Sequence, residues 1–250
     1  MRKRLIWQVA IGPQRPLWEK CLASVATYAE RHGIDYHLQR EPILRIAPKD
    51  SHRSVAALKL GYLPNLEKLA GLDRLGEYDQ VALFDADVWA RPDAPDIFED
   101  VVRQADYAAC VEREMPIIPA YARKLDAYAR GQYGEARFPF FNCGVEVFSA
   151  SIQRHLHGQT AAQFLARPEF VDFIAGKGAW RWASEQTLMN VWLHACGATL
   201  QHLSWRWNGL YGMIDAQRLN EAHLVHFLLS SHLHGDDPET LLRTHGRPRI

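Results

Sequence analysis

The sequence has few cysteines, no excess of either charge and no long apolar run. Its cysteines, Cys21, Cys110, Cys143 and Cys196, form no CxxC pair. This spacing fits reduced thiols in a cytoplasmic protein better than a disulfide framework or a zinc site. The 29 basic and 29 acidic residues cancel, so bulk attraction to nucleic acid or to a membrane is not expected.

No segment approaches the roughly 20 consecutive apolar residues of a membrane span. The basic start, MRKR, is followed by the apolar run LIWQVAIG, but that run is short and ends in GPQRP. It lacks the small-residue cleavage site of a signal peptide. We therefore expect a first strand at residues 5–12.

Strand-like and helix-like segments alternate over the first ~110 residues, which favours an α/β fold with a mostly parallel sheet covered by helices. The expected strands lie at 5–12, 34–40, 78–87 and 107–113. The expected helices lie at 17–33, at 51–72 in two pieces, and at 95–104. The 250 residues contain no internal repeat and no linker, so we expect one domain.

The second half is less regular. Its expected elements are a lid or inserted helix at 115–134, a strand at 141–150, helix from 152 to Arg167, a helix at 184–197, a strand at 198–204, an aromatic loop at 205–213 and a last strand at 222–229. The helix at 184–197 has Ser184 as its expected N-cap and Gly197 after its end.

Two aspartates at the end of a buried strand are the strongest functional signal. In VALFDAD, Asp85 and Asp87 follow an apolar run and are separated by one residue, which puts both side chains on the same side of an extended chain. Ligands of α/β sheets bind outside the carboxyl ends of the strands, and paired carboxylates suit a hard divalent cation. A solvated turn is the alternative, because Asp-x-Asp is common by chance.

Four stretches in order resemble the GT-A glycosyltransferases of family eight, the glycogenin-like and lipopolysaccharide-galactosyltransferase-like group. They are YDQVALFDADVWARPDAPDIFE for the D-x-D region, FNCGVEVFSA for the F-N-x-G-V-x-V-x-S strand, SEQTLMNVWL for the D-Q-x-x-L-N helix start and VHFLL for the late His-Phe. The resemblance implies a GT-A (Rossmann-like) single domain over 1–250. Its nucleotide-binding half is 1–110 and its acceptor-binding half is 111–250.

The resemblance implies that Asp85 and Asp87 bind Mn²⁺ or Mg²⁺ and, through it, the diphosphate of a nucleotide sugar, and that Ala86 between them contacts this donor. His226 would be the third protein ligand of the metal, and an imidazole ligand weakly favours manganese. The chain has 12 histidines, so a structural role for His226 stays open.

The resemblance also assigns other donor contacts. They are the main chain of Ala10, Ile11 and Gly12 for the base, Arg53 or Lys59 for the diphosphate, Asn142 and Gly144 for donor or acceptor, and Asn208 in the aromatic loop. The alternatives are that Arg53 and Lys59 are solvated surface residues and that Asn142 and Gly144 form a bulge in a core strand. Trp205 and Trp207 of the aromatic loop could cover the apolar face of a sugar, and core packing would explain them at least as well.

Glu185 and Gln186 open the helix that the family places close to the anomeric carbon, and they are the implied catalytic residues. Helix-dipole complementarity alone would also account for an acidic residue there. Glu185 is longer than the family's aspartate, which leaves its reach open. Asn190, on the same helix face as Gln186, is expected to pack or to cap.

The resemblance therefore implies an enzyme that transfers a sugar from a UDP-sugar to a glycan or other hydroxyl acceptor, with retention. The family's Lys-Pro-Trp segment is absent; His232, His234 or Arg243 could replace it. Two alternatives stay open. One is a haloacid-dehalogenase-like phosphatase that uses Asp85, Asp87 and GDD at 235–237, and the other is a GT-A-like binding protein without activity. Peripheral membrane association also stays open.

Overall fold

A six-stranded sheet forms the centre of the computed structural model, which describes residues 2–13, 15–48, 59–119, 121–123, 139–177, 185–228 and 237–244. The strand order is β2-β1-β3-β6-β5-β7. The strands are β1 (Arg4–Val9), β2 (Asp35–Gln39), β3 (Gln80–Asp85), β5 (Tyr107–Val111), β6 (Phe141–Ser149) and β7 (Leu200–Leu203). Only β6 runs against the others in this sheet, so the mostly parallel α/β fold expected from the sequence is confirmed.

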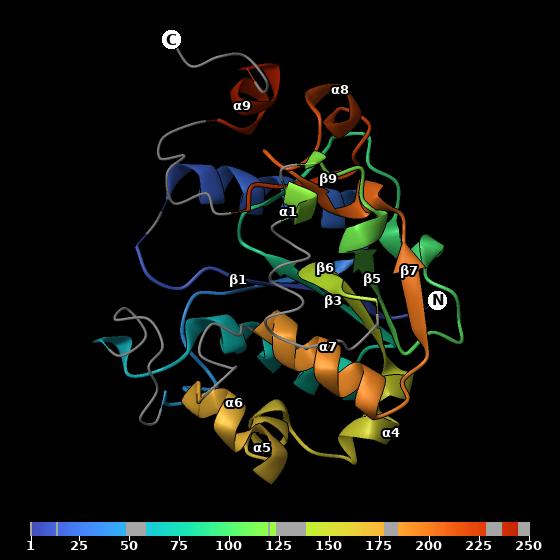
Figure 1. Cartoon of the computed structure of the whole chain (residues 1–250). Helices are drawn as coiled ribbons and strands as arrows, with labels where there is room; N and C mark the ends of the chain where they lie inside the picture. Colours follow the sequence, from blue (N-terminus) through green and yellow to red (C-terminus); the bar gives the residue numbers. More distant parts are fainter. Residues whose placement is uncertain are drawn as a thin grey trace.

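Helices cover both faces of this sheet (Figure 1). Helix α1 (Pro16–Arg31) lies on one face, which we call the α1 face. The other, the α7 face, is covered by the 3₁₀ segment η1 (Pro64–Gly76) and by α5 (Ala161–Leu165), α6 (Val171–Ala175) and α7 (Glu185–Ala195). Since successive side chains of a strand alternate, Ala82 and Phe84 pack on the α1 face while Val81 and Leu83 pack on the α7 face.

A second, three-stranded sheet lies on the α1 face. Its order is β4 (Val88–Ala90), β9 (Leu224–His226) and β8 (Gly209–Leu210). Strand β4 follows β3 after the two-residue turn Ala86–Asp87, and Val88 pairs with His226 across the antiparallel β4–β9 ladder. This pairing brings the last strand of the chain to the carboxyl end of β3.

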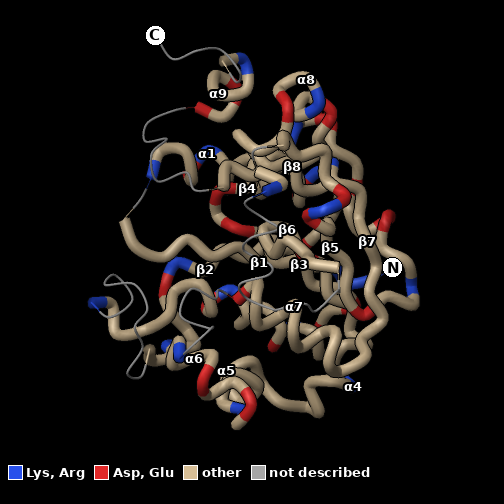
Figure 2. Tube along the Cα trace, viewed as in Figure 1, with Lys and Arg blue, Asp and Glu red and all other residues tan. Residues whose placement is uncertain are grey.

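The remaining elements are short. They are η2 (Ile97–Asp100), η3 (Glu112–Glu114), η4 (Ala150–Ile152), α4 (Gln153–Leu156), η5 (Pro168–Phe170), η7 (Trp205–Asn208), α8 (Ala216–Leu219) and α9 (Pro238–Thr244). None of the helices in the described ranges has the length and hydropathy to cross a bilayer. In the view of Figure 2, basic and acidic residues are interspersed on the outer helices α5, α8 and α9, as expected for a chain without net charge.

Several expected helices differ from the observed ones. The segment 152–167 is not continuous, because His157 and Gly158 have positive φ angles of 55° and 71° and end α4. The helix expected at 95–104 is a single 3₁₀ turn, η2. The second piece of 51–72 forms η1, while residues 51–58 and most of the expected lid at 115–134 lie outside the described residues.

Candidate functional site

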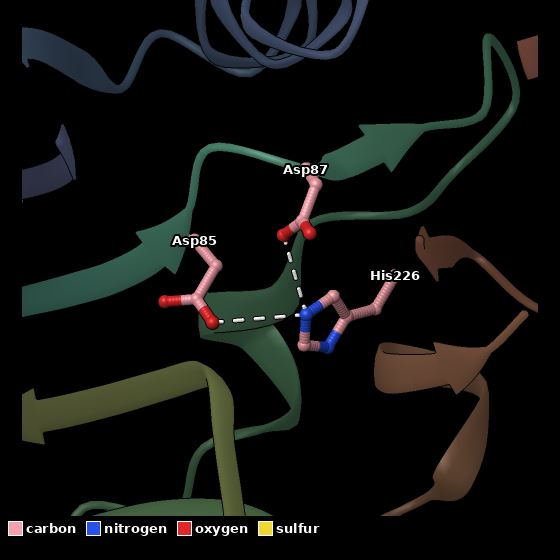
Figure 3. Close-up of side chains that lie close together, drawn as sticks. All are labelled: Asp85, Asp87 and His226. Carbon is pink, nitrogen blue, oxygen red and sulfur yellow. Dashed lines mark ion pairs between the residues drawn. The ribbon is translucent and has the colours of Figure 1, made fainter. Parts of the chain in front are cut away.

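Three side chains converge where β3 meets the second sheet. Asp85 ends β3, Asp87 stands in the turn before β4, and His226 ends β9, with one nitrogen of its imidazole facing both carboxylates (Figure 3). Nε2 of His226 lies 3.3 Å from Oδ1 of Asp87 and 3.7 Å from Oδ2 of Asp85. One ligand atom from each residue lies within 4.8 Å of the other two. We call this group the candidate ion site.

The surroundings of His226 fit a metal ligand. Its Nδ1 lies 3.1 Å from Oδ1 of Asn208; an amide oxygen only accepts, so Nδ1 carries a ring hydrogen and Nε2 is the nitrogen available to an ion. Nε2 is buried and has no hydrogen-bond partner among the described residues. Burial lowers the pKa of His226, but the charges of Asp87 and Asp85 outweigh it and raise that pKa above its ordinary value. Two carboxylates and one such nitrogen suit Mn²⁺ or Mg²⁺.

Gly144 lets the histidine lie against β6. A Cβ added at this glycine would stand 2.2 Å from Cε1 and 2.3 Å from Nδ1 of His226, far inside van der Waals contact. Strand β6 is bulged here, because Ala109 of β5 pairs with Glu146 while Cys110 pairs with Asn142. Bulges re-aim side chains next to sites, and in this structure the group that approaches the glycine backbone is the imidazole.

A chain of hydrogen bonds runs from His226 to the start of α7. Asn208 donates to Oδ1 of Asn142 at 2.7 Å, and Asn142 donates to Oε1 of Glu112 at 2.9 Å. Gln186 donates to the same Glu112 oxygen at 3.1 Å. Burial raises the pKa of Glu112, and the two amide donors partly offset it. The predicted residues Asn142, Asn208 and Gln186 are thus joined through Glu112, which sequence reasoning did not select.

Lys68 of η1 pairs with Asp85 of the candidate ion site, and the sequence analysis missed it. Its Nζ lies 2.9 Å from Oδ1 of Asp85, 3.2 Å from Oε1 of Glu146 and 3.4 Å from Oε1 of Glu185, and it donates to the carbonyl of Cys143. The side chain is 6% exposed. A Glu-Lys pair inside the apolar stretch NLEKLAGL was the signal that could have identified it.

The charges of this cluster stabilise one another. Burial lowers the pKa of Lys68, but Asp85, Glu146 and Glu185 more than compensate and hold it well above its ordinary value. Burial raises the pKa of Glu146 to about 7, against the opposing effect of Lys68. Burial also raises the pKa of Glu185. A buried ammonium with two further carboxylates, those of Glu146 and Glu185, therefore lies directly behind Asp85.

Solved structures resemble this arrangement of strands, whereas no protein-family model and no curated protein sequence matches the chain. A glycosyltransferase involved in the glycosylation of the major capsid of PBCV-1 matches with a TM-score of 0.59, covering 97% of this chain and 98% of its own at 11% identity. The galactosyltransferase LgtC, in complex with donor and acceptor sugar analogs, matches with a TM-score of 0.51 over 90% of this chain and 87% of its own at 14% identity. The chain has the GT-A glycosyltransferase fold.

A third GT-A neighbour, mouse xyloside xylosyltransferase 1, matches with a TM-score of 0.51 over 91% of this chain and 98% of its own at 13% identity. These matches confirm the fold that the four motifs predicted. At such identities the likeness concerns the fold, and the role of each residue remains a matter for proposal.

The predicted base contacts lie beside the D-x-D turn of this GT-A fold. Ala10 is buried and packs in one small cluster with Ala86, and its N–H donates to the carbonyl of Gln39 at 3.0 Å. Ile11 and Gly12 follow it, with Gly12 at a φ of 98° that favours glycine. The structure thus brings the end of β1 to the D-x-D turn.

Other candidates lie elsewhere or are structural. Lys59 is exposed on the surface, and Arg53, His232 and His234 lie outside the described residues. Trp207 is fully buried and donates from Nε1 to Asp100 at 2.6 Å, which is core packing. Asn190 is buried on α7 and bonds both the N–H and the carbonyl of Phe141, so it joins the helix to β6 as packing.

Proposed function

We propose that the chain is a metal-dependent glycosyltransferase that moves a sugar from a nucleotide diphosphate sugar, UDP-linked, to a glycan or other hydroxyl acceptor. The observation that carries this proposal is the buried Nε2 of His226, which faces the carboxylates of Asp85 and Asp87 at the end of a strand of a GT-A fold. Retention of the anomeric configuration rests on the resemblance to family eight alone.

Asp85, Asp87 and His226 would hold the divalent cation. When bound, it would neutralise negative charge that develops on the departing diphosphate, as a Lewis acid does. The imidazole among the ligands favours Mn²⁺ over Mg²⁺. Lys68 lies against Asp85 and would balance the charge of that ligand, whereas the candidate Lys59 is exposed on the surface.

Gln186 and Glu185 are proposed to face the anomeric carbon. The Gln186 amide is fixed in place, since its oxygen accepts from the N–H of Cys143 at 3.0 Å and its nitrogen donates to Glu112. Its remaining lone pair would stabilise positive charge at the sugar, while the leaving diphosphate takes the acceptor proton. LgtC has also been crystallised with an active-site glutamine replaced by glutamate, which supports a role for a glutamine in this fold.

The two halves of the chain would divide the substrates. Residues 1–110 provide the end of β1 and the D-x-D turn for the nucleotide, and residues 111–250 provide Gly144, the α7 start and His226 beside the acceptor. The GT-A fold favours this function over the phosphatase alternative. Of the late acidic motif at 235–237 the structure describes Asp237, which lies before α9 and pairs with Lys20 at 2.8 Å.

A screen of nucleotide sugars for released nucleotide tests this proposal. The purified chain is incubated with each donor and Mn²⁺, Mg²⁺ or EDTA, with and without candidate sugar acceptors. We expect release from a UDP-sugar with Mn²⁺, less with Mg²⁺ and none with EDTA. Release that is indifferent to EDTA would contradict the metal dependence. Binding of UDP and Mn²⁺ by calorimetry without turnover of any donor would favour the inactive binding protein.

A further inference from the structure

Glu146 is a fully buried carboxylate that none of the four motifs explains. It lies in the middle of β6, opposite Leu83 of β3 and Ala109 of β5, and its side chain is 0% exposed. Around it on the α7 face the strands place apolar or aromatic side chains such as Val81 and Phe148. A leucine or methionine would fill this position at less cost, because an ionised group is expensive to bury.

The two oxygens of Glu146 have separate partners. Oε2 accepts from the hydroxyl of Tyr107 at 3.1 Å, and Oε1 lies 3.2 Å from Nζ of Lys68. Apart from that ion pair, Oε1 has no hydrogen-bond partner among the described residues. The tyrosine therefore fixes the carboxylate and directs its second oxygen to the lysine.

Lys68 links Glu146 to Asp85, because its ammonium pairs with both carboxylates. An ammonium has three hydrogens, and four oxygens surround this one, from Asp85, Glu146, Glu185 and the Cys143 carbonyl. In this arrangement the three hydrogens of Nζ are all engaged by these oxygens. On Asp85 the lysine bonds Oδ1, while Oδ2 is the oxygen that faces His226.

We propose that Glu146 is a positioning residue of the candidate ion site, which acts through Lys68 to hold the Asp85 carboxylate with Oδ2 turned toward the ion. The inference rests on the proposed function in that a divalent cation occupies this site. Outer-shell groups that orient metal ligands commonly change metal affinity by about 10–100-fold when they are substituted. Without the charge of Glu146, Lys68 would pair more closely with Asp85 and compete with the cation for it.

Calorimetric titration with Mn²⁺ alone, repeated with UDP present, tests this role without any turnover. Glu146→Gln keeps the size of the side chain and an oxygen for the tyrosine hydroxyl, but removes the charge that holds Lys68. We expect Mn²⁺ to bind about 10–100-fold more weakly. Asp106→Asn is the matched control: Asp106 is also 0% exposed and paired with an arginine, Arg154, and this change is expected to leave Mn²⁺ affinity unaltered.

A double substitution separates positioning from mere stability. If Glu146 acts through Lys68, adding Glu146→Gln to Lys68→Met will weaken Mn²⁺ binding no further than Lys68→Met alone. Additive losses, or wild-type affinity in a folded Glu146→Gln protein, would overturn the proposal. Should Glu146→Gln not fold, Tyr107→Phe replaces it, with a smaller loss expected and an unchanged affinity counting against the proposal.

The two proposals fail in different ways. Mn²⁺ binding that depends on Glu146, in a protein that turns over no nucleotide sugar, would overturn the proposed function and leave the positioning role standing. Sugar transfer together with an Mn²⁺ affinity that is unchanged in Glu146→Gln would support the proposed function and overturn the positioning role. A wild-type chain that binds no Mn²⁺ would overturn both.

Discussion

The two faces of the central sheet hold the same aspartate in different ways. On the α1 face, His226 approaches Asp85 with a neutral amide, Asn208, behind it. On the α7 face, Lys68 approaches Asp85 with carboxylates behind it, among them Glu146. Asp85 ends the strand between the two faces and turns one oxygen to each. The site is thus built from a ligand side and a charge-balancing side.

This difference separates two kinds of disruption. A change on the α1 face removes one of the three ligands of the candidate ion site. A change on the α7 face leaves all three donor atoms in place and alters only their orientation and the charge behind them. We therefore expect the first kind to abolish function and the second to reduce it.

The largest effect is expected from Asp87→Asn. Asp87 lies 3.3 Å from Nε2 of His226, and the substitution removes one anionic ligand while preserving shape. Loss of metal stabilisation of a leaving group is worth several kcal/mol, so kcat/KM should fall by about 10³-fold or more. Steady-state nucleotide release measures it. Asp172→Asn, an exposed aspartate of α6 with a 67% exposed side chain, is the control and should retain full activity.

The next effect concerns the pH dependence of stability. Glu146 has a pKa of about 7 when folded, raised by burial from 4.5. Its contribution to folding is fully present below pH ~4.5 and is lost as the pH rises to about 7, because the unfolded chain releases this proton first. The wild type should lose up to roughly 3 kcal/mol relative to Glu146→Gln across this window. Urea unfolding at pH 4.5, 6 and 7.5 measures it; parallel curves would contradict it.

A smaller effect is expected from Gly144→Ala. The added Cβ would meet the His226 ring at 2.2 Å, so the imidazole must shift away from the carboxylates. Overpacking of this kind costs about 1–3 kcal/mol of unfolding free energy, and Mn²⁺ binding should weaken with it. Gly76→Ala is the control, since its Cβ would meet only Gln153 at 3.9 Å. Equal thermal unfolding and Mn²⁺ affinity in the two variants would argue against a steric role for Gly144.

The ligand side of the site could be predicted from the sequence because its residues stand in short patterns. The D-x-D turn, the FNCG strand start and the late histidine can each be recognised within fewer than ten residues. The GT-A fold that they predicted is confirmed. Their roles as metal and donor contacts stay predictions, although the structure brings Asp85, Asp87, Gly144 and His226 together.

The charge-balancing side could not be predicted in the same way. In VEVF, a polar residue between apolar ones indicates a strand with one solvated face, yet helices cover both faces of β6 and bury Glu146 completely. The Glu-Lys pair in NLEKLAGL marks Lys68 as unusual in an apolar stretch, but only the packing of η1 against the sheet shows that it, and not the exposed Lys59, meets Asp85. A local pattern does not show which charges tertiary packing brings together.

The β4–β9 ladder has a consequence for how the chain folds. It pairs Val88 with His226, so the last described strand must return across most of the polypeptide before the two aspartates meet their histidine. Contacts of such long sequence separation form slowly, since the intervening loop must close first. An ion that binds only the assembled site stabilises the complete fold by mass action. Binding of the ion during refolding would therefore report that β4 and β9 have paired.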